Sequence, residues 1–364
     1  MILKSQKEFD TFLDDYKLFD PNIKLYSFKI KKKRGNKENF DDIKLLLNKK
    51  FKNSRQKSDF RKYNNIFESH FISNNIKKYI RKNIKFILQT KFIINDITIN
   101  FSSYFSKKED MVYFIKNKLE ILIKVYIFMN QFFNKRKNLN FIYYSLPLKK
   151  QINFNQLKPI DTNNVNSGLT SLYPNNHYIM IWRDEELLKV YIHEIIHYLE
   201  LDINMIKMNK IRNIICIDDE SNILPNEAFT DFYAIIIHSL FLSFYKNINY
   251  KDILNKEKTY IMNQAGVILS YYGFKSWMDF ISPKCKILIK QNTSIFSYYI
   301  LKSCLFFNFN KSIKLMNNKK LLENYFIDIL LNDKNYILNI NNIINNFYVK
   351  DDTVSLKMSK YSFF

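Results

Sequence analysis

Residues 193–197 read His193-Glu194-Ile195-Ile196-His197, and this stretch carries the clearest chemical signal in the chain. Two histidines four residues apart on a helix project from one face, one turn from each other, and can bind a single metal ion. The glutamate between them can act as general base toward a zinc-activated water. The alternative is a pair of core histidines satisfied by hydrogen bonds, which is the commoner role of a single buried histidine.

The segment 183–202 favours a buried helix around this motif. Asp184 is a candidate N-cap, and Glu185 and Glu186 would lie in the first turn, where the helix dipole favours carboxylates. Apolar side chains occupy most of the circumference, which is typical of a buried helix: Leu187, Leu188, Tyr191, Ile192, Ile195, Ile196 and Leu199. We therefore expect both histidines to lie inside the protein.

A catalytic zinc needs a third protein ligand and one open position for water. Pro225 precedes two carboxylates and an apolar run, a pattern that predicts the start of a helix. Glu227 and Asp231 are four residues apart and share a face of that helix. One can bind the metal while the other accepts a hydrogen bond from a ligand imidazole. Alternatively, both are solvated carboxylates of a first turn. Rival third ligands are Glu200, Asp202 and the cluster Asp218-Asp219-Glu220.

The motif followed by Asn226-Glu227-Ala228-Phe229-Thr230-Asp231 resembles the gluzincin, or thermolysin-like, zinc metallopeptidases over residues 166–240. The resemblance implies a complete zinc site: ligands His193, His197 and Glu227 for one Zn²⁺, general base Glu194, and Asp231 as the carboxylate that orients a ligand histidine. The run 166–170, followed by residues 178–181 and the motif helix, is similar to proteins of large DNA viruses that are classed as metallopeptidases.

Gluzincins also use a tyrosine or histidine downstream of the third ligand to stabilise the oxyanion of the tetrahedral intermediate. On this resemblance two neighbouring tyrosines are expected to be catalytic, Tyr298 and Tyr299; the other candidates are Tyr271, Tyr272 and His238. We interpret His238 as a core histidine, because it lies about 16 Å along the helix from Glu227. Residues 166–170 are the candidate edge strand for pairing with an extended peptide, so the predicted substrate-binding residues are Ser167, Gly168 and Leu169.

The formal net charge of +23 suits a polyanionic partner. The charge is uneven, because residues 31–63 hold thirteen Lys/Arg against four Asp/Glu, whereas residues 184–231 hold four against eleven. The basic charge therefore lies away from the motif. Two interpretations stay open: a surface at residues 31–63 for nucleic acid or an acidic partner, or the compositional drift of an AT-rich coding sequence.

Only four glycines and six prolines occur in 364 residues, which predicts long helices with few tight turns. Short aromatic and β-branched runs at 141–146 and 178–182 predict strands before the motif helix. We expect an α+β fold, predominantly α-helical. A mainly helical basic N-terminal region would span 1–140, a zincin-like catalytic core with a small mixed sheet 141–250, and a helical C-terminal subdomain 251–364. Residues 31–42 are expected to form an exposed loop, and the tail from Asp351 to be frayed.

Three widely spaced cysteines, Cys216, Cys285 and Cys304, indicate neither a disulfide framework nor a zinc ribbon. The charged N-terminus lacks the apolar core of a signal peptide, and the longest apolar run is too short for a membrane span. We expect a soluble protein of a reducing compartment, in a host cytoplasm or a virion.

The sequence thus predicts a zinc metallopeptidase of gluzincin type, an endopeptidase acting on peptide or protein substrates. The alternative is a catalytically inactive zinc-containing binding or structural protein that uses its basic N-terminal half to hold nucleic acid or an acidic partner.

Overall fold

The computed structural model describes residues 24–32, 69, 71–94, 96–156, 158–173, 176–202, 208–282, 284–315, 319–347 and 352–364. These residues form two compact units. Unit 1 comprises Lys149–Asn166 and Leu201–Ser362, and unit 2 comprises the described part of Asp15–Leu148 together with Ser167–Glu200 and Phe363–Phe364. The units therefore do not coincide with the expected regions 1–140, 141–250 and 251–364, because the chain crosses between them several times.

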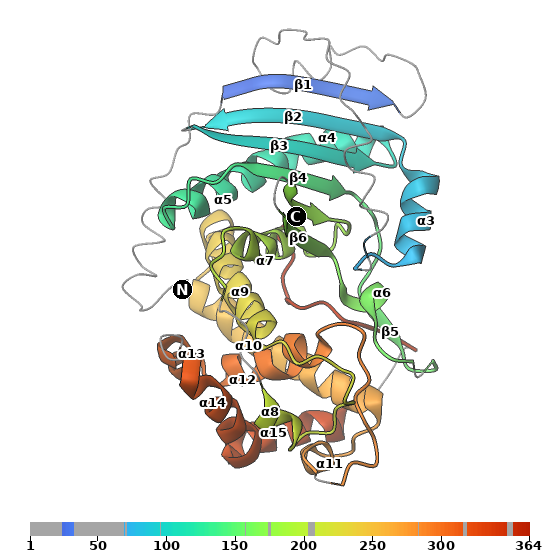
Figure 1. Ribbon diagram of the computed structural model, residues 1–364, viewed down its shortest axis with the longest axis vertical. Coiled ribbons are helices and arrows are strands. Elements are labelled where there is room, and N and C mark those ends of the chain that lie inside the picture. Colours follow the sequence, from blue (N-terminus) through green and yellow to red (C-terminus); the bar gives the residue numbers. More distant parts are fainter. Residues whose placement is uncertain are drawn as a thin grey trace. The chain divides into compact units, whose positions relative to one another are not determined.

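Unit 2 is built on a mixed six-stranded sheet with the order β1-β2-β3-β4-β7-β6 (Figure 1). Its strands are β1 Lys24–Lys32, β2 Phe86–Ile94, β3 Ile97–Phe105, β4 Leu139–Tyr144, β6 Gly168–Tyr173 and β7 Asn176–Ile181. Strands were not expected in the region 1–140, but its described residues include β1, β2 and β3, which form an antiparallel meander. Ile, Phe and Thr dominate β2 and β3, and short apolar runs of this kind do not distinguish strand from helix by period alone.

Alternation along β4 gives the sheet two distinct faces, as the two-residue period of a strand requires. Ile142 and Tyr144 join the apolar cluster that includes Ile76 and Ile80 of α3 Asn74–Asn83. On the opposite face, Phe141 packs edge-on against Tyr191 with ring centroids 4.8 Å apart. The helices in contact on this side are α4 Lys108–Asn117, α5 Leu119–Phe132 and α7 Leu187–Tyr198.

Helix α7 is buried as predicted, but it begins later than expected. Its first residue is Leu187, and Glu186 precedes it in the left-handed region with φ of 59°. Asp184 is therefore not the N-cap. Its carboxylate instead accepts hydrogen bonds from the Tyr143 hydroxyl and from the Lys118 ammonium, whose Nζ lies 2.5 Å away. These two bonds fix the turn that leads into the helix.

Unit 1 is mostly helical around the long helices α9 Pro225–Lys246 and α10 Tyr250–Tyr272. Pro225 occupies the first turn of α9, as its sequence predicts. By length and composition α9 resembles a membrane span, but 83% of its most apolar window is buried inside the protein. Buried apolar residues all around a helix are what a core helix of a large domain requires.

The remaining elements of unit 1 are shorter. They are β5 Gln151–Asn153, α6 Thr162–Val165, α8 Asn209–Arg212, α11 Trp277–Phe280, the π-helix η2 Phe296–Leu301, α12 Lys302–Phe307, α13 Phe309–Leu315, α14 Lys319–Asn332, α15 Lys334–Asn346 and β8 Thr353–Ser355. Strand β8 pairs antiparallel with β5, and Leu356 beyond it is fully buried. The prediction of a frayed tail is thus wrong, because the described residues 352–362 pack onto unit 1.

The cysteines also differ from expectation. Cys216 and Cys285 form a disulfide within unit 1, with Cα atoms 5.4 Å apart. Cys304 is a free, buried cysteine, and burial raises the pKa of its thiol to about 12. Absence of a Cys-x-x-Cys pattern therefore did not exclude a bridge between distant segments, since pairing depends on which loops the fold brings together.

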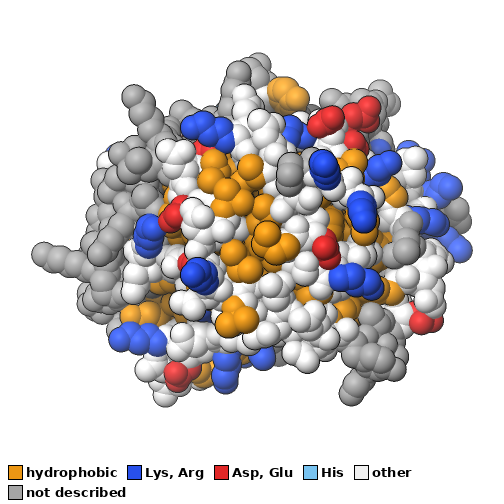
Figure 2. Space-filling model, turned by 90° about the horizontal axis from the view of Figure 1, so that it is seen from below, with side chains coloured by type: hydrophobic (Ala, Val, Ile, Leu, Met, Phe, Trp, Pro, Cys, Tyr) orange, Lys and Arg blue, Asp and Glu red, His pale blue; other side chains and the backbone are white. Residues whose placement is uncertain are grey.

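Several large apolar side chains of unit 1 stay exposed in and around α11, α14 and α15: Met278, Ile287, Leu288, Leu331 and Leu338. Figure 2 shows hydrophobic side chains gathered on one face, with Lys and Arg side chains around them. None of these five residues belongs to the motif helix or to the first turns of α9.

Candidate metal and hydrolytic site

The two motif histidines lie on one face of α7, as their spacing predicts. Nε2 of His193 and Nε2 of His197 are 3.2 Å apart, and the ring planes are inclined at 73°. His193 is buried and His197 is half-buried. The rings are thus not stacked on each other but direct the same type of nitrogen toward a common point.

This separation fits a shared metal ion. Ligand nitrogens at about 2.05 Å from a tetrahedral zinc, about 109° apart, lie about 3.3 Å from each other. The distance between the two Nε2 atoms is 3.2 Å. Without a metal the same distance suits a hydrogen bond between one ring that carries a proton on Nε2 and one that does not. The two histidines therefore need little rearrangement to change from the metal-free hydrogen-bonded pair to a metal-bound pair.

Glu194, the expected general base, is held by the neighbouring strand β6. The Thr170 hydroxyl lies 2.8 Å from the carboxylate oxygen Oε2 and 2.9 Å from the backbone carbonyl oxygen of the same glutamate. Glu194 is only 6% exposed. A hydrogen bond to a hydroxyl on a rigid strand restricts the rotamers of this carboxylate, so its oxygens occupy a defined place beside the histidines.

Gly168 lies against the side chain of Glu194. A Cβ atom at this position would be 2.7 Å from Oε1 of Glu194, 3.0 Å from its Cγ and 3.0 Å from Cγ1 of Val190. Real Cβ atoms almost never approach other atoms this closely, so any other residue would displace the carboxylate. The glycine predicted as a substrate-binding residue makes room for the Glu194 carboxylate.

The other two predicted substrate-binding residues contribute differently. Leu169 packs on the cluster that contains Met180 and Trp182, so its side chain lies on the sheet face opposite α7. Ser167 is buried, and its carbonyl accepts a hydrogen bond of 2.9 Å from the Trp182 amide. The prediction of an edge strand at 166–170 holds for 168–170, because β6 is the last strand in the sheet order of the described residues. Any peptide pairing here would use the backbone of β6.

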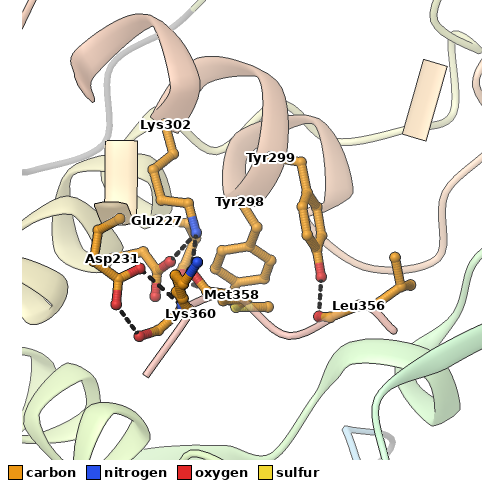
Figure 3. A network of polar contacts seen from close by, with 10 residues as sticks. Glu227, Asp231, Tyr298, Tyr299, Lys302, Leu356, Met358 and Lys360 are labelled. Atoms are coloured by element: carbon orange, nitrogen blue, oxygen red, sulfur yellow. Dashed lines mark hydrogen bonds and ion pairs between the residues drawn. The ribbon is translucent and has the colours of Figure 1, made fainter. Parts of the chain in front are cut away.

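In unit 1, Glu227 and Tyr298 contact each other. The Tyr298 hydroxyl donates to Oε2 of Glu227 over 2.9 Å (Figure 3). Glu227 lies in the first turn of α9 and is half-buried, and Tyr298 lies in the π-helix η2. A carboxylate has about four lone-pair sites, so this hydrogen bond leaves Glu227 able to bind a metal. Single-turn π-helices occur frequently at functional sites.

One turn further along both helices, Asp231 and Lys302 form a second contact. Nζ of Lys302 is 2.6 Å from Oδ2 of Asp231, and both side chains are at most 1% exposed. The same ammonium donates to the Met358 carbonyl over 3.1 Å. Because Glu227 and Asp231 are four residues apart and Tyr298 and Lys302 are also four apart, the two helices meet in two successive rungs. The predicted role of Asp231 in orienting a histidine stays a prediction.

Tyr299 does not share the position of Tyr298. It is fully buried, and its hydroxyl donates to the Leu356 carbonyl over 2.7 Å. Figure 3 shows its ring directed away from Glu227. Neighbouring residues on a helix point about 100° apart, so only one of the two tyrosines can face Glu227. Tyr299 holds the C-terminal segment, and its predicted catalytic role is not supported.

The remaining donor candidates have structural partners. The Tyr271 hydroxyl lies within 3.0 Å of the Gln156 and Lys158 carbonyl oxygens, and the Tyr272 hydroxyl donates to the Lys290 carbonyl. His238 is 1% exposed in the middle of α9, in agreement with its interpretation as a core histidine. Tyr298 is thus the best placed of these candidates.

Among the rival third ligands, Glu200 is bound elsewhere. Its carboxylate pairs with Lys137 at 2.8 Å, and the side chain is 65% exposed. The hydrogen bond from Lys137 lowers the pKa of Glu200. Asp219 and Glu220 are exposed, and Asp202 and Asp218 are half-buried. Glu227, which is also half-buried, contacts another predicted site residue, Tyr298.

Two residues of these sites were missed by sequence reasoning, Thr170 and Lys302. Thr170 ends the run 166–170 that carries the viral resemblance, and its position two residues after Gly168 places both on one face of a strand. Lys302 follows Tyr298 by four residues, a spacing that could have pointed to a shared helix face. Its pairing with Asp231, 71 residues away, has no signature in the sequence.

Comparison with known proteins adds little to these observations. No protein-family model matches the chain, and no solved structure matches it. A 102-residue stretch is 31% identical to the Uncharacterized protein R210 of Acanthamoeba polyphaga mimivirus, covering 26% of each chain. The chain thus spans about a quarter of the length of this relative. The relative's name states no activity.

Proposed function

We propose that this protein is a zinc-dependent peptidase of gluzincin type, in which His193, His197 and Glu227 bind one zinc ion. These three side chains are a ligand set able to hold a metal. The observation that carries the proposal is the pair of Nε2 atoms 3.2 Å apart on a buried helix, with Glu194 between the two histidines. Two imidazoles and one carboxylate are a common ligand set of catalytic zinc.

Glu194 is the proposed general base. Bound zinc would polarise the scissile carbonyl and lower the pKa of water. Glu194, held by Thr170 and accommodated by Gly168, takes a proton from the attacking water and passes it to the leaving amine. A general base must be held in a fixed position relative to the attacking water, and the contacts with β6 restrict the rotamers of Glu194 accordingly.

Glu227, Asp231 and Tyr298 are the proposed contributions of unit 1. Glu227 is the third ligand and Asp231 orients a ligand histidine. The Tyr298 hydroxyl donates to Glu227 in this structure and is the proposed donor to the oxyanion of the tetrahedral intermediate. Substrate would lie along β6, whose position at the end of the sheet order suits pairing with an extended peptide. The sheet of unit 2 with α7 packed on β6 and β7 agrees with a zincin-like core.

Metal analysis and a peptide-library cleavage profile of the purified protein test the proposal together. We expect one zinc per chain and cleavage that a chelator abolishes and added zinc restores. Glu227→Ala should lose the zinc, whereas Glu200→Ala, which alters an exposed carboxylate outside the proposed site, should keep it. Stoichiometric zinc in Glu227→Ala would refute the ligand assignment. Cleavage within peptides, away from both ends, would mark an endopeptidase.

Zinc without cleavage would favour the alternative, a binding protein that retains the metal. Its predicted nucleic-acid surface, residues 31–63, and the expected exposed loop 31–42 lie outside the described residues, apart from Lys31 and Lys32 at the end of β1. Salt-sensitive binding of DNA or RNA that disappears when residues 31–63 are neutralised would support it.

A further inference from the structure

Two segments of unit 1 lie side by side from the disulfide to the Glu227–Tyr298 contact. The first segment, residues 216–224, leads into α9, and the second, residues 285–295, leads into η2. They are joined at one end by the Cys216–Cys285 disulfide. Next, Ile217 and Ile289 form a parallel β-bridge. The amide of Ile289 donates to the Cys216 carbonyl over 2.9 Å, and the amide of Asp218 donates to the Ile289 carbonyl over 3.0 Å.

We call this series of contacts between the two segments the ladder. Gln291 contributes three hydrogen bonds in its middle. Its amide donates to the Ser221 hydroxyl over 3.2 Å, and its side-chain Nε2 donates to the Asn222 carbonyl over 2.6 Å. Its Oε1 accepts from the Phe296 amide over 2.8 Å. The side chain is therefore bonded both to the segment before α9 and to the start of η2. Gln291 is 8% exposed, so water competes little for these bonds.

The last rungs reach the proposed site. The Ser297 hydroxyl accepts a hydrogen bond of 3.2 Å from the Leu224 amide. The Tyr298 hydroxyl then donates to Glu227 over 2.9 Å. The partners rise in order along both segments, from Cys216 and Cys285 to Glu227 and Tyr298. Each rung therefore restricts the slip of one segment along the other.

The bonds of Gln291 and Ser297 also replace ordinary helix capping. Leu224 precedes α9 with no capping bond from its own side chain, and no side chain caps η2 from its N-cap position. The first amides of a helix need acceptors from outside that helix. Here the acceptor for the Leu224 amide lies on η2, and the acceptor for the Phe296 amide lies in the ladder. The Leu224 amide is thus satisfied only when the two segments lie in register, and the Gln291 side chain that accepts from Phe296 also bonds across to Asn222.

We propose that Gln291 and Ser297 are positioning residues that hold the Tyr298 hydroxyl on Glu227, and that the Cys216–Cys285 disulfide anchors the ladder. This inference rests on the proposed role of Glu227 as a metal ligand. It adds that the placement of this ligand is set by a segment about seventy residues further along the chain. Neither Gln291 nor Ser297 needs to touch substrate or metal.

Hydrogen exchange in the metal-free protein tests the ladder independently of any activity. In Gln291→Ala the amides of both Leu224 and Phe296 should exchange faster, although only the Phe296 amide loses its own acceptor. In Ser297→Ala the same two amides should respond. Gln264→Ala is the matched control, because Gln264 is 7% exposed and bonds to Tyr260 and the Ser355 carbonyl, away from the ladder. Faster exchange only at the amide that lost its acceptor would show separate caps and overturn the proposal.

Zinc affinity and kinetics then test the consequence. Groups that orient a metal ligand typically change metal affinity by about tenfold to a hundredfold when removed. We expect Gln291→Ala and Cys216→Ser with Cys285→Ser to weaken zinc binding by about tenfold and to lower kcat with little change in KM. Ser297→Ala should have the same two effects, whereas Ser297→Thr, which keeps the hydroxyl, should retain wild-type zinc affinity and kcat, and Cys304→Ser should change neither. Zinc affinity unchanged in a folded Gln291→Ala protein would overturn the positioning role. If neither wild type nor any variant hydrolysed peptides, the peptidase assignment would be refuted, but the positioning role would not be.

Discussion

Unit 2 and unit 1 build their chemical groups in different ways. In unit 2 the two histidines and the glutamate come from one helix, and Thr170 and Gly168 come from the strand beside it. In unit 1, side chains of α9 meet side chains of η2 and α12 about seventy residues later, and the C-terminal segment accepts a further bond. The first arrangement depends on helical periodicity, whereas the second depends on long-range packing. We therefore expect a single substitution in the unit 2 group to lower activity more than stability. A single substitution in the unit 1 group should lower stability more than activity.

Glu194→Gln should give the largest effect on chemistry and tests the local arrangement of unit 2. The amide keeps the shape of the carboxylate but cannot take a proton, so kcat should fall roughly 10²–10⁴-fold. Zinc content and the unfolding midpoint should change little, because His193 and His197 are intact. Peptide cleavage assays and metal analysis on the same preparation measure both. Cleavage at the wild-type rate would remove Glu194 from the mechanism.

Lys302→Met tests unit 1 and should give the largest loss of stability. Removing this cation takes away the positive charge 2.6 Å from the buried Asp231 carboxylate, a change that typically costs about 3–5 kcal/mol. Urea unfolding followed by circular dichroism measures the change. The double variant Lys302→Met with Asp231→Asn should recover part of the loss, since it carries no buried charge at this position. A loss below about 1 kcal/mol in the single variant would show that the pair behaves like a surface pair.

Gly168→Ala should combine a moderate loss of stability with a loss of activity. The new methyl group would lie 2.7 Å from Oε1 of Glu194, so the carboxylate must move. Overpacking of this kind costs about 1–3 kcal/mol. Gly266→Ala is a useful control, because its Cβ would lie 2.3 Å from Cγ2 of Ile343 in unit 1. Both variants should be destabilised, but only Gly168→Ala should lower kcat. Equal loss of activity in both would argue against a special role of Gly168.

Glu200→Gln should give the smallest effect and tests whether the proposed metal site extends beyond the motif helix to Glu200. The exposed pair with Lys137 contributes about 0–1 kcal/mol, and zinc should be retained. The hydrogen bond from Lys137 lowers the pKa of Glu200 below its ordinary value in the folded protein. A lowered pKa means that the contribution is present above the unfolded-state pKa and is lost as pH falls through the folded-state value. The stability difference between wild type and variant should therefore vanish in acid, as thermal unfolding across pH can show.

Much of unit 2 followed from the sequence, because short-range patterns specify it. The His193–His197 spacing predicted a shared face, the apolar circumference predicted a buried helix, and the runs before the motif predicted strands. The start of α7 was placed too early, because Asp184 is recruited by Lys118 and Tyr143. The strands at 86–105 were missed because a short apolar run has the same composition in a strand and in a helix.

Less of unit 1 could be predicted. Pro225 marked the start of α9 correctly, and four-residue spacing placed Glu227 and Asp231 on one face. The disulfide, the packed tail and the choice of Tyr298 over Tyr299 could not be read from the chain. Each depends on which distant segment lies opposite, and the order of helices in space has no local signature.

The sequence by itself determined which histidines share a face of the motif helix. Two imidazoles four residues apart share a face in any α-helix, whatever surrounds it, because the period is a property of the backbone. Only the tertiary structure decided what holds those groups in place. Thr170 and Gly168 confine Glu194, Tyr298 contacts Glu227, and Lys302 neutralises Asp231, because strand order and helix packing bring residues together that are far apart in the chain.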